Sequence, residues 1–249
     1  MTWLAEYLPT LIGVLILVLL TGVLLWCYRV PQFWTPATAV LRGALQLAAI
    51  SLVLSGVITN PWLVACALGV MFLVAALTAT RRLGSTSAHL LMVSTAMLIG
   101  VTATLAVVFL SGALEPSPRY LLAIGGIVVG NAMGTATLTG RYFTAAADAR
   151  WDEVEGWLAL GATPRQATFA LARSAVRSAL VPAIDQTKTT GLVTLPGAFV
   201  GAIFGGISPL EAGRFQIVVL ACVLAAGSIT AVTIATWLAP VKQRPQART

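Results

Sequence analysis

The run FQIVVLACVLAAGSITAVTIATWLAPV at Phe215–Val241 decides the fold class, because it contains no charged side chain. An α-helix rises 1.5 Å per residue and needs about 20 apolar residues to cross roughly 30 Å of hydrocarbon. This run is long enough for one crossing. Its apolar residues are continuous and do not alternate with a period of two, which indicates a membrane helix and not a strand of a membrane barrel.

The composition of the whole chain leads to the same class. Of its 249 residues, 58% are hydrophobic and 9% are charged, whereas an average soluble domain carries about 25% charged residues. Such scarcity excludes a water-soluble fold, and the apolar content excludes disorder. The sequence therefore predicts an all-α integral membrane protein whose single domain covers residues 1–249. The net charge of +7 is interpreted through the sides of a bilayer, so no nucleic-acid partner is expected.

Five more charge-free runs extend the pattern, and one of them is about twice the usual length. This run, Gly43–Thr80, has the turn signal Asn60-Pro61 at its middle and is divided there into two spans. The first span lacks the basic start and the small-residue cleavage site of a signal peptide, so it is predicted to be permanent. In total about seven transmembrane helices are predicted, at residues 8–28, 38–58, 62–80, 90–111, 120–140, 190–208 and 215–238.

The distribution of Lys and Arg predicts the orientation, because cytoplasmic loops are enriched in these residues. With the N-terminus outside, only Arg119 and Arg214 lie on the outer side, and Arg42 lies near the inner end of the second span. Twelve others lie inside: Arg29, Arg81, Arg82, Arg141, Arg150, Arg165, Arg173, Arg177, Lys188, Lys242, Arg244 and Arg248. The sequence therefore predicts an outer N-terminus and a cytoplasmic C-terminus.

The chain offers no catalytic constellation. Its three cysteines are widely separated, and His89 is the only histidine, so neither a His-based metal site nor a catalytic triad is expected. The phosphate-binding loop GxxxxGK[ST] is absent from the sequence. We expect a chain that is not an enzyme, with no metal site and no cofactor of its own. If ATP drives it, a separate chain must hydrolyse the nucleotide.

One long polar segment, residues 141–188, interrupts the membrane pattern on the predicted cytoplasmic side. It is acidic at first and continues through Leu160-Gly161-Ala162-Thr163-Pro164 into a basic amphipathic helix, for which Thr163 is suited as N-cap. Two interpretations stay open. The helix lies on anionic headgroups, or the turn between two short helices forms a knob that fits a partner's groove.

A resemblance favours the second interpretation. The stretch Glu155 to Pro164 looks like the cytoplasmic "EAA" loop of ABC transporter permeases, whose helix inserts into the ATPase subunit. Nearly the whole chain resembles the FetB (YbbM) family of ABC permeases, which is related to the plant aluminium-tolerance permeases. The blocks that carry this resemblance are Arg42–Leu47, Gly130–Met133, Leu158–Ala162, Lys188–Gly197, Gly201–Ala212 and Phe215-Gln216.

The resemblance implies a permease subunit of an ATP-binding cassette exporter in the bacterial inner membrane, with iron as the cargo associated with the family. A P-loop ATPase partner would carry ATP and Mg. Because seven spans are few for a complete path, we expect a homodimer. The predicted cytoplasmic coupling segment is 141–188, and its ATPase-coupling residues are Asp152, Glu153, Glu155, Leu160, Gly161, Ala162, Thr163 and Pro164.

Polar and small residues inside the spans define further candidates. Asn131, Thr135 and Thr139 form a stripe at i, i+4 and i+8, which either lines a path or forms interhelical hydrogen bonds. The candidates for the translocation path are Arg42, Gln46, Asn131, Met133, Thr135 and Gln216, although Arg42 is better suited to reach the headgroups. For the sixth span, Pro196 predicts a kink and Gly197, Gly201 and Gly205 predict close helix packing.

The cargo is constrained by the absence of Asp and Glu from the predicted spans. A bare divalent cation at membrane depth requires carboxylate, thiolate or imidazole ligands, so a low-affinity path or a chelated metal is expected. A small organic or sugar-nucleotide solute is the alternative cargo. Alternative functions are a secondary transporter, which usually needs an intramembrane acid, and a membrane scaffold that does not transport.

Overall fold

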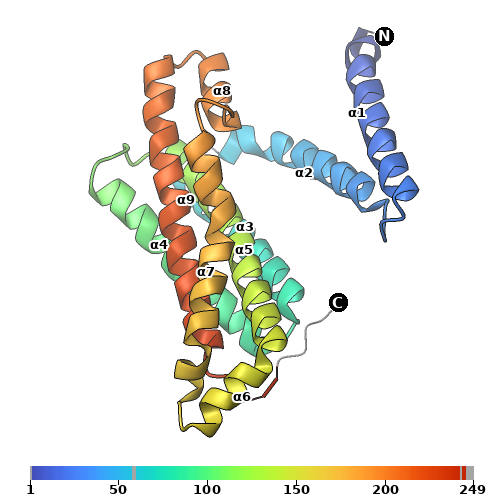
Figure 1. Ribbon diagram of the computed structural model, residues 1–249. Helices are drawn as coiled ribbons and strands as arrows, with labels where there is room; N and C mark the ends of the chain where they lie inside the picture. The colour runs from blue at the N-terminus through green and yellow to red at the C-terminus, as the bar shows by residue number, and fades with distance from the viewer. Residues whose placement is uncertain (1, 58–59, 242, 245–249) are drawn as a thin grey trace. The chain divides into compact units, whose positions relative to one another are not determined.

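The computed structural model describes residues 2–57, 60–241 and 243–244, and in these ranges the regular structure consists of nine α-helices (Figure 1). Two compact units divide the chain, Met1–Val57 and Ile58–Thr249. Each unit is described by itself. The all-helical class predicted from the sequence is confirmed.

The first unit is a pair of helices, α1 (Thr2–Cys27) and α2 (Thr35–Val57), that contact each other. Between them the chain turns with Arg29 and Gln32 both at a φ of 57°. In α1 the apolar stretch Tyr7–Cys27 has none of its residues buried in protein. A helix that is apolar on all sides is typical of a membrane span.

The second unit is a helical bundle with α5 and α9 in contact at its centre, while α3, α4 and α7 pack around them (Figure 1). Its helices are α3 (Pro61–Leu83), α4 (Ser87–Leu110), α5 (Pro118–Ala149), α6 (Trp151–Ala159), α7 (Pro164–Thr189), α8 (Gly197–Phe204) and α9 (Pro209–Leu238). The main core joins α3, α4, α5 and α9 through buried Ala, Val and Met side chains such as Ala76, Met97, Val128 and Val223.

Small residues let these helices approach closely. A Cβ atom added at Gly100 of α4 would lie 2.7 Å from the Thr230 hydroxyl and 2.8 Å from the Ala226 carbonyl oxygen of α9. On α5, Gly125 and Gly140 lie against Leu68 and Leu83 of α3. Such close approach is how membrane helices gain packing energy without a hydrophobic driving force between them.

The contacts fix the direction of each helix in the second unit. Tyr120 of α5 packs against Phe215 of α9 at one end, with ring centroids 5.6 Å apart, and α8 contacts α9 there. The opposite end holds α6, the end of α5 and the start of α7 (Figure 1). We call these the α8 end and the α6 end. Helix α7 runs from the α6 end to the α8 end, antiparallel to α9.

Five of the described helices are long and apolar enough to cross a membrane: α3, α4, α5, α9 and the Tyr7–Cys27 part of α1. They correspond to five of the predicted spans. The predicted span at 38–58 corresponds to α2, although residue 58 lies outside the described residues.

The predicted span at 190–208 is wrong. Residues 190–196 form a turn with an isolated bridge between Thr190 and Thr194, and only Gly197–Phe204 is helical. Two glycines in the left-handed region, Gly191 at a φ of 87° and Gly206 at 91°, interrupt the backbone on either side. The long helix of this region is instead α7, which packs along α5 and α9 through buried small residues such as Ala175 and Ala179.

Candidate functional site

The α6 end carries a short helix that is held firmly by the bundle. Trp151 and Val154 of α6 are buried in a cluster with Phe143 and Ala147 of α5 and Leu171 of α7. The acidic residues Asp152 and Glu153 lie in the first turn of α6, where the helix dipole favours negative charge. Helix α6 thus contacts both of its neighbours in the chain, α5 and α7.

A tight turn connects α6 to α7. Gly161 adopts a φ of 86°, a conformation that side chains with a Cβ rarely accept. The Thr163 backbone N–H donates to Gln166 Oε1 at 2.8 Å, and the Gln166 N–H donates to Thr163 Oγ1 at 3.4 Å. These two bonds are the capping box that starts α7, and Pro164 occupies the first turn. The predicted cap and helix start are confirmed.

The apolar side chains at this turn point away from the protein. Leu160 is 82% exposed, and Trp157 is also exposed on α6. Ala162 is half-buried, so the turn presents one large leucine on a narrow support. We call Trp157 to Pro164 the knob. Trp157 and Leu160 together form an exposed apolar tip on α6 and the turn that follows it.

The carboxylates around the knob differ in their partners. Glu153 accepts hydrogen bonds from Arg150, at 2.6 Å from Nη2, and Glu155 accepts one from Trp151 Nε1 at 2.6 Å. Both therefore brace α6 itself. Asp152 is exposed and, among the described residues, has no hydrogen-bond or ion-pair partner. Its charge acts on Arg244 through space without a direct bond.

A second ion pair ties the C-terminal stretch to α5. Arg244 Nε donates to Asp148 Oδ1 at 2.7 Å, and Arg244 Nη2 donates to the Asp148 carbonyl oxygen at 3.2 Å. The hydrogen bond to Asp148 and its charge raise the pKa of the Arg244 guanidinium above its ordinary value. The arginine is therefore charged at any physiological pH, and this tie does not act as a pH switch.

Two of the three residues in the predicted polar stripe bond within α5, and the third faces α9. The hydroxyl of Thr139 donates to the Thr135 carbonyl at 2.8 Å, and Asn131 Nδ2 donates to the Ile127 carbonyl at 2.9 Å. Thr135 is buried, and its hydroxyl would lie 3.4 Å from a Cβ added at Gly227 of α9. In this conformation the stripe packs between helices. Whether it lines a path in another conformation stays a prediction.

The other path candidates fall in different places. Gln216 of α9 is only 6% exposed, and its side-chain oxygen has no hydrogen-bond partner within the described residues. Met133 of α5 is partly buried against the main core. Arg42 and Gln46 are exposed on α2, in the first unit. Asn131, Met133, Thr135 and Gln216 thus lie in the helical bundle of the second unit. Arg42 and Gln46 lie in the first unit.

The predicted kink and glycine packing of the sixth span take another form. Pro196 is the N-cap residue of α8, so it begins a helix and does not kink one. A Cβ added at Gly197 or Gly201 would meet no described atom within 4 Å. At Gly205 the near atoms are carbonyl oxygens of α8 itself, at 3.3 Å. Close packing at these glycines stays a prediction for contacts outside the described chain.

Comparison with known proteins identifies the family. A family model described as "Uncharacterised protein family (UPF0014)" matches residues 8–241. The chain belongs to UPF0014. The resemblance to the FetB family predicted from the sequence is thereby confirmed, because a FetB protein is among the similar chains.

Three relatives illustrate the range of the family. The chain is 33% identical over 237 residues to Protein ALUMINUM SENSITIVE 3 of Arabidopsis thaliana, covering 93% of this chain and 86% of the relative. It is 36% identical over 202 residues to UPF0014 membrane protein STAR2 of Oryza sativa subsp. japonica, covering 80% and 70%. It is 39% identical over 137 residues to Probable iron export permease protein FetB of Escherichia coli, covering 55% and 53%. No solved structure matches the chain.

Two observations on this UPF0014 chain bear on metal binding. Among the described residues, no group of three or more His, Cys, Asp or Glu side chains is placed to hold a metal ion. Sequence reasoning also missed Asp185, which lies in the last turns of α7 with Lys188 Nζ 3.5 Å away.

The pattern that could have revealed α7 as a bundle helix is its series Ala167, Leu171, Ala175 and Ala179 at intervals of four.

Proposed function

We propose that this UPF0014 chain is the membrane permease subunit of an ATP-driven exporter, and that its knob docks into a separate P-loop ATPase. The observation that carries the proposal is the exposed Leu160 at the tip of a turn whose base, α6, is buried between α5 and α7. The printed name of the FetB relative, an iron export permease, supports transport as the function.

The topology that fits this role has seven crossings, namely α1, α2, α3, α4, α5, α7 and α9. Here α7 takes the place predicted for residues 190–208, so the N-terminus stays outside and the C-terminus stays cytoplasmic. Only the first part of the 141–188 segment then belongs to the cytoplasm. Helix α7 starts at the knob and ends at the opposite side of the bilayer, so movement of the ATPase is passed directly through the membrane.

Helix α7 also changes the argument about the cargo. With α7 as a crossing, Asp185 supplies a carboxylate near the outer side, and buried Gln216 supplies an unpaired amide oxygen in the same half of the bundle. Oxygen ligands of this kind suit a metal ion held weakly or through a chelator. We propose iron or another metal as the cargo, released to the outside past these residues.

A homodimer completes the proposed transporter. The α8 end exposes large apolar side chains, among them Phe204 and Leu210, and α8 has an open glycine face at Gly197 and Gly201. Small residues allow two helices to approach closely in lipid. We propose that this face packs against a second copy, and that each copy binds one ATPase carrying ATP and Mg.

The test is retention of an ATPase. The tagged chain is purified from its native membranes in mild detergent, and the proteins that accompany it are identified by mass spectrometry. We expect a P-loop ATPase in about one copy per chain. The variant Leu160→Glu should lose it, because a charge cannot enter an apolar groove without a partner. The variant Leu192→Glu, at the other end of α7, should retain it.

Two results would contradict the proposal. One is that no ATPase is retained by the unaltered chain. The other is that Leu160→Glu and Leu192→Glu retain it equally. Because Asp185 is also the kind of acid that a gradient-driven transporter uses, transport in vesicles must be measured with and without ATP. Transport that needs a proton gradient and no ATP would favour the secondary transporter.

A further inference from the structure

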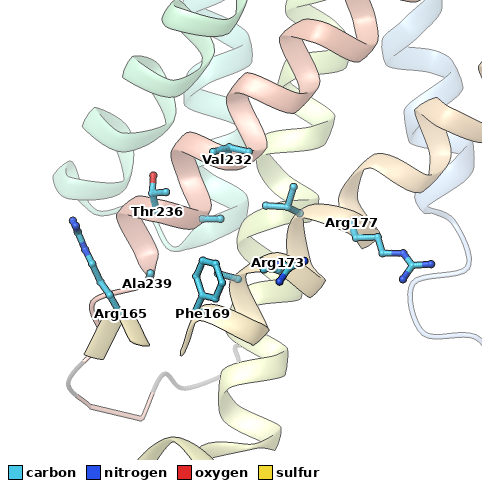
Figure 2. Close-up of a pocket in the computed structure, with 10 residues that line it drawn as sticks. Arg165, Phe169, Arg173, Arg177, Val232, Thr236 and Ala239 are labelled. Carbon is cyan, nitrogen blue, oxygen red and sulfur yellow. The ribbon is translucent and has the colours of Figure 1, made fainter. Parts of the chain in front are cut away.

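A groove of about 470 Å³ lies between the first half of α7 and the last turns of α9 (Figure 2). The α7 wall includes Phe169 and Val176, and the α9 wall includes Val232 and Ala239. Together these apolar walls form an open slot between the two helices. Such a slot suits a hydrocarbon chain, and the knob is not part of it.

Three arginines of α7, Arg165, Arg173 and Arg177, border this groove, and its lining contains no carboxylate. Figure 2 shows Arg165 and Arg177 on opposite sides of Phe169, with Arg173 near the ring. The Arg173 guanidinium lies 5.7 Å from the Phe169 ring centroid, a cation–π distance that holds it beside the slot. Within the described part of the chain, no acid forms an ion pair with any of the three.

The depth of the groove matches the boundary between hydrocarbon and headgroups. It lies where α9 approaches its end at Leu238, and Trp237 is exposed at the same level. Tryptophans are enriched at this boundary of membrane proteins. Other arginines of the bundle, Arg81 and Arg82 at the end of α3, also lie toward the α6 end. The part of the groove nearest the knob, with Arg165, thus lies at the level of lipid phosphates, whereas Arg173 and Arg177 lie about 12 and 18 Å further along α7.

We propose that this groove is a binding site for one anionic phospholipid, with an acyl chain in the slot and the headgroup phosphate held by Arg165 and Arg173 at the end nearest the knob, while Arg177 lies further along the slot. Basic pockets between membrane helices are known to bind anionic headgroups in this way. The three arginines favour an anionic headgroup over a zwitterionic one, because a zwitterionic headgroup would also bring its cation toward them. The occupied site would join α7 to α9 and stabilise the helix that bears the knob.

The experiment is native mass spectrometry of the purified, delipidated full chain, titrated with phosphatidylglycerol or phosphatidylcholine. We expect one phosphatidylglycerol to bind at least roughly tenfold more tightly than phosphatidylcholine. The triple variant R165A/R173A/R177A should lose this preference. The control R81A/R82A/R141A removes the same charge from the same end, outside the groove, and should keep it.

A second variant separates the slot from the charges. Val232→Trp fills the groove from an exposed position and leaves the arginines in place, so bound phosphatidylglycerol should fall at least about tenfold. Size-exclusion chromatography checks that each variant is folded. The proposal is overturned if both triple variants lose the preference equally, if V232W binds as the unaltered chain does, or if millimolar inorganic phosphate displaces the lipid. It is also overturned if these variants change the oligomeric state, because a second copy then fills the groove.

Discussion

Helix α7 and residues 190–208 are opposites in sequence and in structure. Helix α7 contains five charged residues, Arg165, Arg173, Arg177, Asp185 and Lys188, yet it forms 26 residues of continuous helix packed along α5 and α9. Residues 190–208 contain no charge, yet they form a turn and an eight-residue helix. The apolar stretch thus forms the shorter helix, and the polar stretch forms the longer one.

The comparison teaches that the apolar or polar composition of a stretch does not by itself decide where a long packed helix forms. A helix that packs on two neighbours needs small residues on its buried face, and α7 provides Ala167, Ala175 and Ala179. Its charges lie on the other faces. Conversely, glycines and a proline in 190–208 weaken the helix that its apolar composition suggests.

The largest effect is expected from a charge on the buried face of α7. Ala179 is buried, so Ala179→Glu places an unpaired carboxylate between helices and should destabilise the fold by about 3 kcal/mol or more. The yield of monodisperse protein should collapse in size-exclusion chromatography. Gln186→Glu, on the exposed face of the same helix, adds the same charge and should leave the yield unchanged. Equal yields would break the comparison, because α7 would then not be packed.

A smaller effect separates the glycines of the core from those of α8. Gly100→Ala puts a methyl group 2.7 Å from the Thr230 hydroxyl, which should cost about 1–3 kcal/mol and lower the Tm measured by thermal unfolding in detergent. Gly201→Ala meets open space in the chain and gains helix propensity, so the Tm should stay level or rise. If Gly201→Ala instead dissociates the dimer, the glycine face packs against a second copy, as proposed.

The smallest effect concerns a single hydrogen bond between α7 and α9. The buried Thr168 hydroxyl lies 2.6 Å from the Ala239 carbonyl oxygen, and Thr168→Val should cost about 1 kcal/mol. Thr187→Val removes a hydroxyl that bonds within α7, to the Ala183 carbonyl, and should cost less. A larger loss from Thr187→Val, measured by the same thermal unfolding, would show that α7 is held at its far end and not at the knob.

Features that depend only on neighbouring residues, such as turns and helix caps, could be predicted from the sequence. The N-cap at Thr163, the turn at Gly161 and the turn signal Asn60-Pro61 all depend on neighbouring residues, and all correspond to breaks between helices in the structure. The place of α7 depends on which distant helices cover its alanine face, and this information is not contained in a charge count. Asp185 was missed because it falls in the segment 141–188, which the charge count predicts to be cytoplasmic.

The candidate site divides in the same way. The knob could be predicted because its turn and caps are encoded within about ten residues, from Glu155 to Pro164. The surroundings of Gln216 and Thr135 could not, because they depend on the packing of α5 against α9. The groove bordered by the three arginines was equally hidden, since its apolar wall on α9 lies more than fifty residues away along the chain.

The central claim, that α7 crosses the membrane with the knob at its inner end, is tested most directly by side-specific labelling. The residues Leu160 and Leu192 flank α7 and are 82% and 92% exposed. Each is changed to Cys in a chain whose Cys27, Cys66 and Cys222 are replaced, and intact cells are treated with an impermeant maleimide. We predict that Leu192→Cys is labelled from outside and Leu160→Cys only after permeabilisation. Labelling of both only after permeabilisation would contradict the account, because α7 would then not cross the membrane.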